Sequence, residues 1–62
     1  LLDIDSDKQA LELGIESEKR SIEMLKSLLE KEKKLDVKAI FSHLLVEEKK
    51  HLLMLQDLKA KL

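Results

Sequence analysis

Apolar residues recur at helical spacing along almost the whole 62-residue chain, and the pattern breaks once, at residues 33–36. Spacings of three and four place side chains on one face of a helix, so the pattern predicts two long helices joined by a short turn. Proline is absent, Gly14 is the single glycine, and Leu, Glu and Lys dominate, which is typical of an all-α protein. We expect one domain over residues 1–62, with helices at about 6–33 and 37–60 and a turn at about 34–36.

Local signals at the expected helix ends support these bounds. Ser6 and Gln9 have the spacing of a capping box, and Asp5 is an alternative cap for the same helix start. Lys33 and Lys34 suit the end of the first helix, and Asp36 is predicted as the N-cap of the second. Because the turn has only a few residues, the two helices must form an antiparallel hairpin.

Each expected helix carries polar residues inside its apolar stripe. At about 100° per residue, Glu18 falls in the centre of the first stripe, and Glu48 and His51 fall inside the second. The first stripe consists of Leu11, Ile15, Ile22, Leu25 and Leu29, and the second of Val37, Ile40, Phe41, Leu44, Leu55, Leu58 and Leu62.

The composition narrows the classes of function. Two helices cannot enclose a core, and a chain of this size without cysteine needs a metal or a partner chain for stability. We therefore expect a homo-oligomer, either a dimer or a multiple of dimers.

The 12 basic and 13 acidic residues are interspersed, so no nucleic-acid partner is expected. No apolar run is long enough for a membrane span and no signal-peptide pattern appears, which favours a cytoplasmic protein. Since the sequence begins Leu-Leu, the native chain can also be longer than 62 residues.

The hairpin register predicts that the three polar residues meet. Residues equally distant from the turn lie at the same height, and the midpoint between Glu18 and the Glu48/His51 pair falls near Lys34, inside the turn. Glu-x-x-His on a helix places both side chains on one face, one turn apart. Three polar groups at one height must satisfy each other, bind water or bind a metal ion.

One hairpin supplies only three ligands, but a symmetric dimer doubles them. A twofold axis at the level of the site would place four Glu and two His in a four-helix core. That is the ligand set of carboxylate-bridged di-iron and di-manganese bundles. We predict Glu18, Glu48 and His51 as metal ligands, with two iron ions per dimer and manganese or zinc as alternatives. No catalytic residue beyond these ligands is predicted.

The segments "ALELGIESEKRSIEML", residues 10–25, and "IFSHLLVEEKKHLLML", residues 40–55, resemble one helix pair of the rubrerythrin-type ferritin-like family. The resemblance covers about half of the usual four-helix domain, and its metal ligands match Glu18, Glu48 and His51. It implies iron oxidation coupled to dioxygen or peroxide reduction, or iron storage. Met24 and Leu25 stand where related sequences often have Phe-Tyr, and no cysteine-ligated iron centre is present. Both differences weaken a full peroxidase assignment more than they weaken metal binding.

Other interpretations of the same residues remain open. Glu48 can be a solvated boundary residue and His51 a histidine at the flank of the helix, in which case the chain is a structural dimerisation module without catalysis. The chain can also be a fragment of a longer ferritin-like protein. His43 is expected to be exposed, and Glu47 to form an ion pair at the helix flank. Ala10, Gly14, Ser17 and Ser21 form a ridge of small residues suited to close helix packing, and Val46 and Leu53 point away from the stripe.

Overall fold

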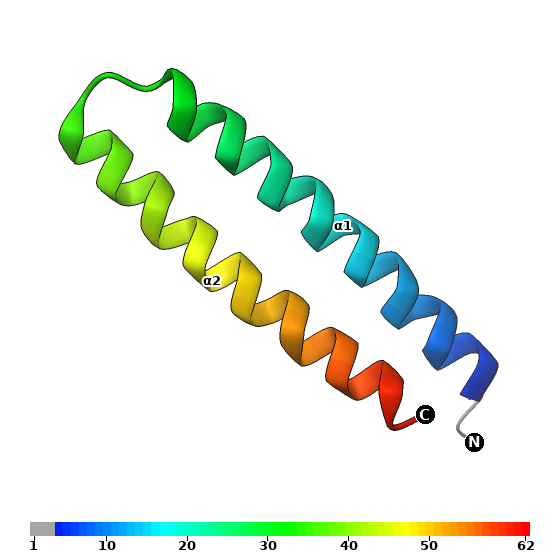
Figure 1. The fold of residues 1–62 in the computed structure, drawn as a ribbon. Coiled ribbons are helices and arrows are strands. Elements are labelled where there is room, and N and C mark those ends of the chain that lie inside the picture. Colours follow the sequence, from blue (N-terminus) through cyan, green and yellow to red (C-terminus); the bar gives the residue numbers. More distant parts are fainter. Residues whose placement is uncertain (1–3) are drawn as a thin grey trace.

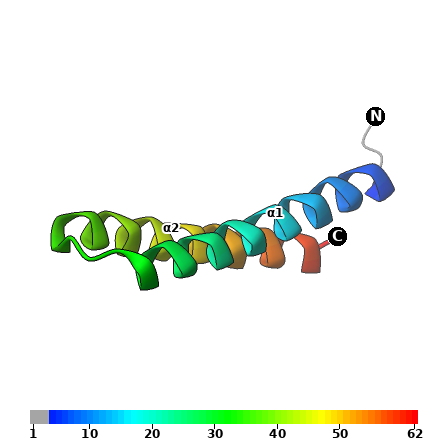
Figure 2. The same ribbon diagram turned by 90° about the horizontal axis from the view of Figure 1, so that it is seen from above.

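The computed structural model describes residues 4–62, which form two antiparallel helices lying side by side (Figure 1). Helix α1 spans Ile4–Lys31 and helix α2 spans Leu35–Ala60. Together they make a rod of 49 × 16 × 14 Å, and the view from above shows that the hairpin is a single layer (Figure 2). The all-α hairpin is thus confirmed, with no strand among the described residues. The first three residues of the predicted domain lie outside the described range.

The turn occupies residues 32–34, two residues earlier than predicted. The carboxylate of Glu32 explains the shift, because its Oε1 accepts hydrogen bonds from the backbone N–H groups of Lys33 and Lys34 at 3.1 and 3.0 Å. The N-cap of α2 is Lys34, in an extended conformation and without a side-chain capping bond, so the prediction of Asp36 as N-cap is wrong. Asp36 lies in the first turn of α2, where its negative charge interacts favourably with the positive end of the helix dipole.

The start of α1 also differs from the prediction. The helix already includes Ile4, Asp5 and Ser6, so neither Asp5 nor Ser6 is its N-cap. Asp5 and Asp7 lie in the first turn, where acidic side chains are favourable. The capping-box spacing of Ser6 and Gln9 therefore lies inside the helix rather than at its boundary.

The buried core comes from α1. Ile15, Ile22 and Leu25 are buried, and Leu11 and Leu29 are half-buried, which confirms the first predicted stripe. No described side chain of α2 is fully buried. Two helices alone therefore shield one row of side chains and leave the rest of the apolar surface in contact with solvent.

The face that α2 presents to α1 is rotated relative to the predicted stripe. Leu45 and Leu52, which were not predicted, are half-buried together with Val37, Phe41 and Leu55. Four predicted members of the stripe remain exposed: Ile40 (58%), Leu44 (42%), Leu58 (49%) and Leu62 (52%). The predicted stripe thus covers two sectors of α2, one against α1 and one open to solvent.

Five of the eleven large apolar side chains that are exposed among the described residues share one side of the hairpin with Ala10. We call this side the open face, and its residues are Ala10, Leu28, Ile40, Leu44, Leu58 and Leu62. Ala10 and Leu28 are 18 residues apart, as are Ile40 and Leu58, and Leu44 and Leu62. Eighteen residues make five full helical turns, so each pair shares one direction. Ala10, Leu58 and Leu62 also line a common groove, which places the rows from both helices on the same side.

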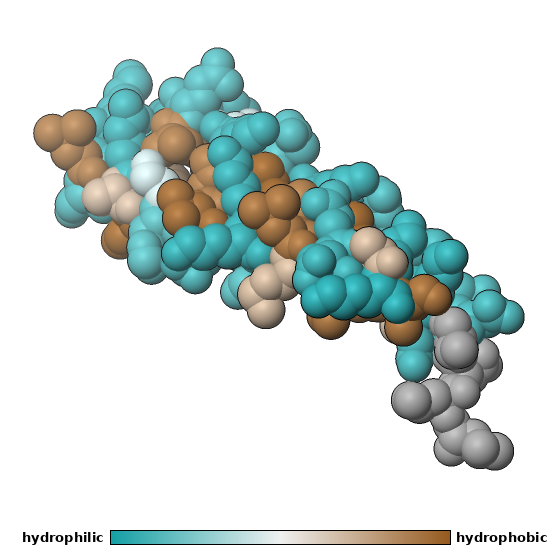
Figure 3. Space-filling view, turned by 60° about the horizontal axis from the view of Figure 1, so that its bottom comes forward, coloured by the Kyte–Doolittle hydropathy of each residue, from teal (hydrophilic) through white to brown (hydrophobic). Residues whose placement is uncertain are grey.

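The opposite side of the hairpin carries charged residues of both signs, and Lys19, Lys26 and Lys59 form ion pairs there with glutamates. Its grooves are lined by Lys8, Lys19 and Lys59 near the open end, and by Lys26 and Lys49 further along. On the face drawn in Figure 3, apolar side chains emerge between hydrophilic ones. The two sides of this single layer therefore differ in chemistry, because lysine–glutamate pairs lie along one side and a row of exposed apolar side chains lies along the other.

Candidate metal centre

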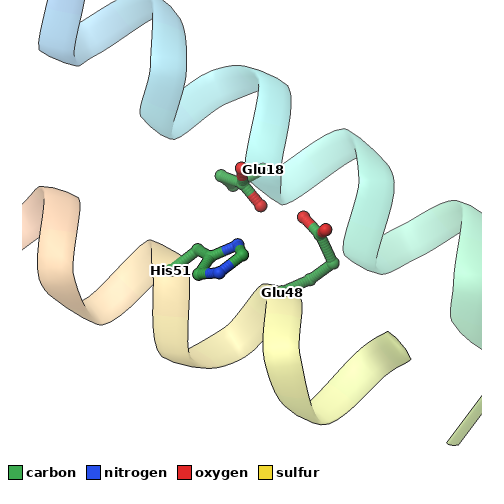
Figure 4. Close-up of side chains that lie close together, drawn as sticks. All are labelled: Glu18, Glu48 and His51. Carbon is green, nitrogen blue, oxygen red and sulfur yellow. The ribbon is translucent and has the colours of Figure 1, made fainter. Parts of the chain in front are cut away.

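The three predicted ligand residues meet in the space between the two helices. Glu18 projects from the middle of α1, and Glu48 and His51 project from α2 one turn apart, all toward one another (Figure 4). Each residue offers one ligand atom, and these atoms lie within 4.8 Å of one another. The prediction that the residues lie at one height is confirmed. Within residues 4–62, no other three His, Asp or Glu side chains come this close.

The site is sheltered on one side and open on the other. Glu18 and Glu48 are half-buried, whereas His51 is exposed. Glu18 lies between the buried Ile15 and Ile22 in the sequence, so it projects from a segment of α1 that packs in the core. His51 lies seven residues before Leu58 and eleven after Ile40, within the apolar row of the open face. The cluster therefore faces the uncovered side of the hairpin.

The Glu18 carboxylate is the least satisfied group of the cluster. Its Oε2 atom is buried and has no hydrogen-bond partner within the described part of the chain. A hydrogen bond with Glu48 raises the pKa of Glu18, and burial and the negative charge of Glu48 raise this pKa further. The charge of His51 acts in the opposite direction. A buried, unpaired carboxylate oxygen is costly, and a cation placed between the three side chains would remove that cost.

The geometry and the donor atoms fit a transition-metal ion. Metal–ligand distances of about 2.0–2.2 Å place ligands on opposite sides of an ion about 4.2 Å apart. The ligand atoms, which lie within 4.8 Å of one another, would therefore need to move by less than about 1 Å to bind one ion. Carboxylate and imidazole donors suit iron, manganese and zinc. Three protein ligands leave positions of a six-coordinate ion for water, a substrate or further protein ligands.

The residues next to the cluster behave as the sequence predicts. His43 is exposed, and Glu47 pairs with Lys50, with Oε1 and Nζ 3.6 Å apart. Gly14 packs on α2, where a Cβ atom at this position would lie 3.4 Å from Leu55 Cδ1. Ser21 is half-buried, whereas Ala10 and Ser17 are exposed, so only part of the small-residue ridge serves packing within the hairpin.

Comparison with protein-family models, with curated proteins and with solved structures finds no match to this chain. The resemblance to rubrerythrin-type ferritin-like proteins thus rests on the residues named above, and the functional argument rests on the cluster itself.

Proposed function

We propose that the protein binds iron through Glu18, Glu48 and His51, in a site completed by a second copy of the chain. The observation that carries this proposal is the convergence of two carboxylates and an imidazole within 4.8 Å, around a buried carboxylate oxygen without a partner. Buried polar atoms normally have a hydrogen-bond partner, and the hydrogen bond between Glu18 and Glu48 still leaves Glu18 Oε2 without one. An unsatisfied acceptor at the centre of three ligand residues instead favours a bound cation.

A second copy supplies what one hairpin lacks. Two hairpins bring four Glu and two His to one core, which is enough for two metal ions in the manner of carboxylate-bridged bundles. The predicted ferritin-like four-helix bundle, the two irons per dimer and the family assignment belong to this proposal. So do manganese or zinc as alternative metals.

A cytoplasmic location stays a prediction of the sequence. Neither described helix combines the length and apolar character needed to cross a membrane.

The proposed reaction is oxidation of iron(II) by dioxygen or peroxide. Glu18, Glu48 and His51 would hold the iron, and two iron(II) ions would supply the two electrons that, with two protons, convert one peroxide molecule to two water molecules. The carboxylates of Glu18 and Glu48 favour the iron(III) product because each adds negative charge. Glu18, whose pKa is raised, holds a proton more readily than an ordinary carboxyl group and releases it when a cation arrives. The missing tyrosine, at the position of Leu25, favours slow turnover.

An iron-oxidation assay tests this function. Two iron(II) per dimer are added without oxygen, the sample is exposed to peroxide or air, and the near-ultraviolet absorbance of iron(III) is followed. The chain has no Trp or Tyr, so the protein background is small. The parent should oxidise iron faster than buffer does, and Glu18→Ala should lose this excess. Glu16→Ala is the matched control, because Glu16 is exposed and forms an ion pair with Lys19 across 3.7 Å. Equal rates in the parent, in Glu18→Ala and in buffer would rule out the reaction.

A structural dimerisation module is the second candidate, and the exposed apolar open face favours it. This face requires a partner whether or not a metal is bound. Metal content separates the two candidates, because a purely structural dimer would hold no stoichiometric metal.

A further inference from the structure

We propose that a second copy covers the open face in one defined orientation. In it, α2 lies antiparallel on α2 of the partner subunit, α1 lies on α1, and the turn of each hairpin covers the open end of the other. This inference rests on the proposed function, because it names the partner surface that completes the Glu18, Glu48 and His51 site.

The exposed row of α2 is symmetric about His51. Leu44 and Leu58 each lie seven residues from His51, and Ile40 and Leu62 each lie eleven residues away. At 1.5 Å per residue, these pairs lie about 10.5 and 16.5 Å on either side. A twofold axis perpendicular to the helices at the height of His51 exchanges these heights. Leu44 then meets Leu58 of the partner subunit, and Ile40 meets Leu62 of the partner subunit.

The row of α1 on the open-face side has its own centre at nearly the same height. Ala10 and Leu28 each lie nine residues from Lys19, and Ser17 and Ser21 each lie two residues away. Gly14 lies against Leu55, so Lys19, five residues further along α1, lies at the height of residue 50, one residue from His51. A single twofold axis can therefore pair α2 with α2 of the partner subunit and α1 with α1 of the partner subunit. An isologous interface requires such a common axis. The same axis passes the metal cluster.

An apolar groove at the open end of the hairpin receives the turn end of the partner. The groove has a volume of about 360 Å³ and is lined mainly by Ala10, Leu11, Leu58 and Leu62. The axis brings Leu28, Leu44 and Ile40 of the partner subunit to the heights of Ala10, Leu58 and Leu62. Leu28 of the partner subunit thus faces Ala10, the smallest residue of the groove. A large side chain opposite a small one is the kind of fit by which packed helices interlock. The symmetry forms this contact twice.

The exposed area and the charge distribution favour the same partner. The chain exposes 5065 Å², whereas a folded monomer of 7.2 kDa is expected to expose about 4,100 Å². The excess of roughly 900 Å² is close to the roughly 800 Å² that each partner buries in a standard interface. On the opposite side of the hairpin, Lys19, Lys26 and Lys59 form ion pairs with Glu16, Glu23 and Glu12, so that side offers charged pairs to a second copy instead of an apolar row.

Cysteine cross-linking tests the orientation, because the native chain has no cysteine to interfere. In Leu44→Cys/Leu58→Cys the two thiols lie about 21 Å apart along one helix, too far to pair within a chain. Mild oxidation should convert most of this variant to a covalent dimer, and Ile40→Cys/Leu62→Cys should behave likewise. Leu44→Cys and Leu58→Cys alone should stay largely uncoupled. Val46→Cys/Leu53→Cys, on the outward surface of α2, is the matched control and should also stay uncoupled.

Two results would overturn the orientation. One is cross-linking of Leu44→Cys alone as efficiently as the double variant, and the other is no more covalent dimer from both designed pairs than from the outward control pair. Circular dichroism of each variant establishes that the helices are retained. Metal analysis of the same samples separates the two proposals. Cross-linked dimers without metal refute the proposed function and support the orientation, whereas metal-loaded dimers that fail to cross-link refute only the orientation.

Discussion

Truncation of Leu44 should weaken the dimer much more than truncation of a more exposed leucine on the same helix. Leu44 lies on the open face and is 42% exposed in the single hairpin, so a partner subunit can remove that fraction from water. Full burial of a leucine side chain is worth about 1.5–3 kcal/mol, so this fraction is worth about 1 kcal/mol per subunit. The symmetry doubles the effect to about 2 kcal/mol per dimer, or roughly a 30-fold increase in Kd.

The matched control is Leu53→Ala, which makes the same chemical change on α2. Leu53 is 66% exposed and points away from the open face, so the dimer Kd should remain within about threefold of the parent value. Sedimentation equilibrium over a range of concentrations measures both constants, and circular dichroism at the same concentrations monitors helicity. If Leu53→Ala weakens the dimer as much as Leu44→Ala, or if neither variant changes Kd, the open face is not the interface.

Three further predictions concern stability and protonation. Gly14→Ala should stabilise the fold by about 1 kcal/mol and raise Tm by about 4–8 °C, because the new Cβ meets Leu55 Cδ1 at 3.4 Å and alanine favours a helix; a lower Tm in thermal melts would show that the helices cannot accommodate the methyl group. In the metal-free protein the pKa of Glu18 is raised above its ordinary value of 4.5, so the unfolded state loses its proton first as pH rises. Stability relative to Glu18→Gln should therefore fall above pH 4.5 until Glu18 is ionised in the folded state as well, and parallel denaturation curves for the two proteins across this range would contradict the assignment. Metal binding should release protons and tighten as pH rises through the same range, which calorimetry in buffers of different ionisation enthalpy measures; binding without proton release would show that Glu18 is not a ligand.

Much of the hairpin follows from the sequence because helical periodicity reports burial directly. Ile15, Ile22 and Leu25 recur at spacings of seven and three, and all three are buried. The meeting of Glu18 with Glu48 and His51 also follows, since a short turn fixes which residues share a height. These predictions use only the regular geometry of helices, and the sequence contains that information.

The contact face of α2 does not follow from the sequence in the same way. Periodicity identifies the apolar face of a helix. It does not separate residues that pack on α1 from residues that remain exposed in the single hairpin. Leu45 and Leu52 face α1, whereas Leu44 and Leu58 remain exposed, and the predicted stripe averaged the two directions. The displacement of the turn has a local cause, because the Glu32 carboxylate bonds to the next two backbone N–H groups. Such a side-chain contact leaves no periodic signal.

The most direct test of the metal centre is a count of metal ions per dimer. Native mass spectrometry of the protein after iron(II) loading and removal of excess metal gives the oligomer and its metal content together. The parent should appear as a dimer, or a multiple of dimers, carrying two iron ions per dimer. His43→Ala should match the parent because His43 is exposed outside the cluster, whereas His51→Ala should lose the metal. A monomer without iron, or the same metal content in both histidine variants, would contradict a metal centre built from Glu18, Glu48 and His51.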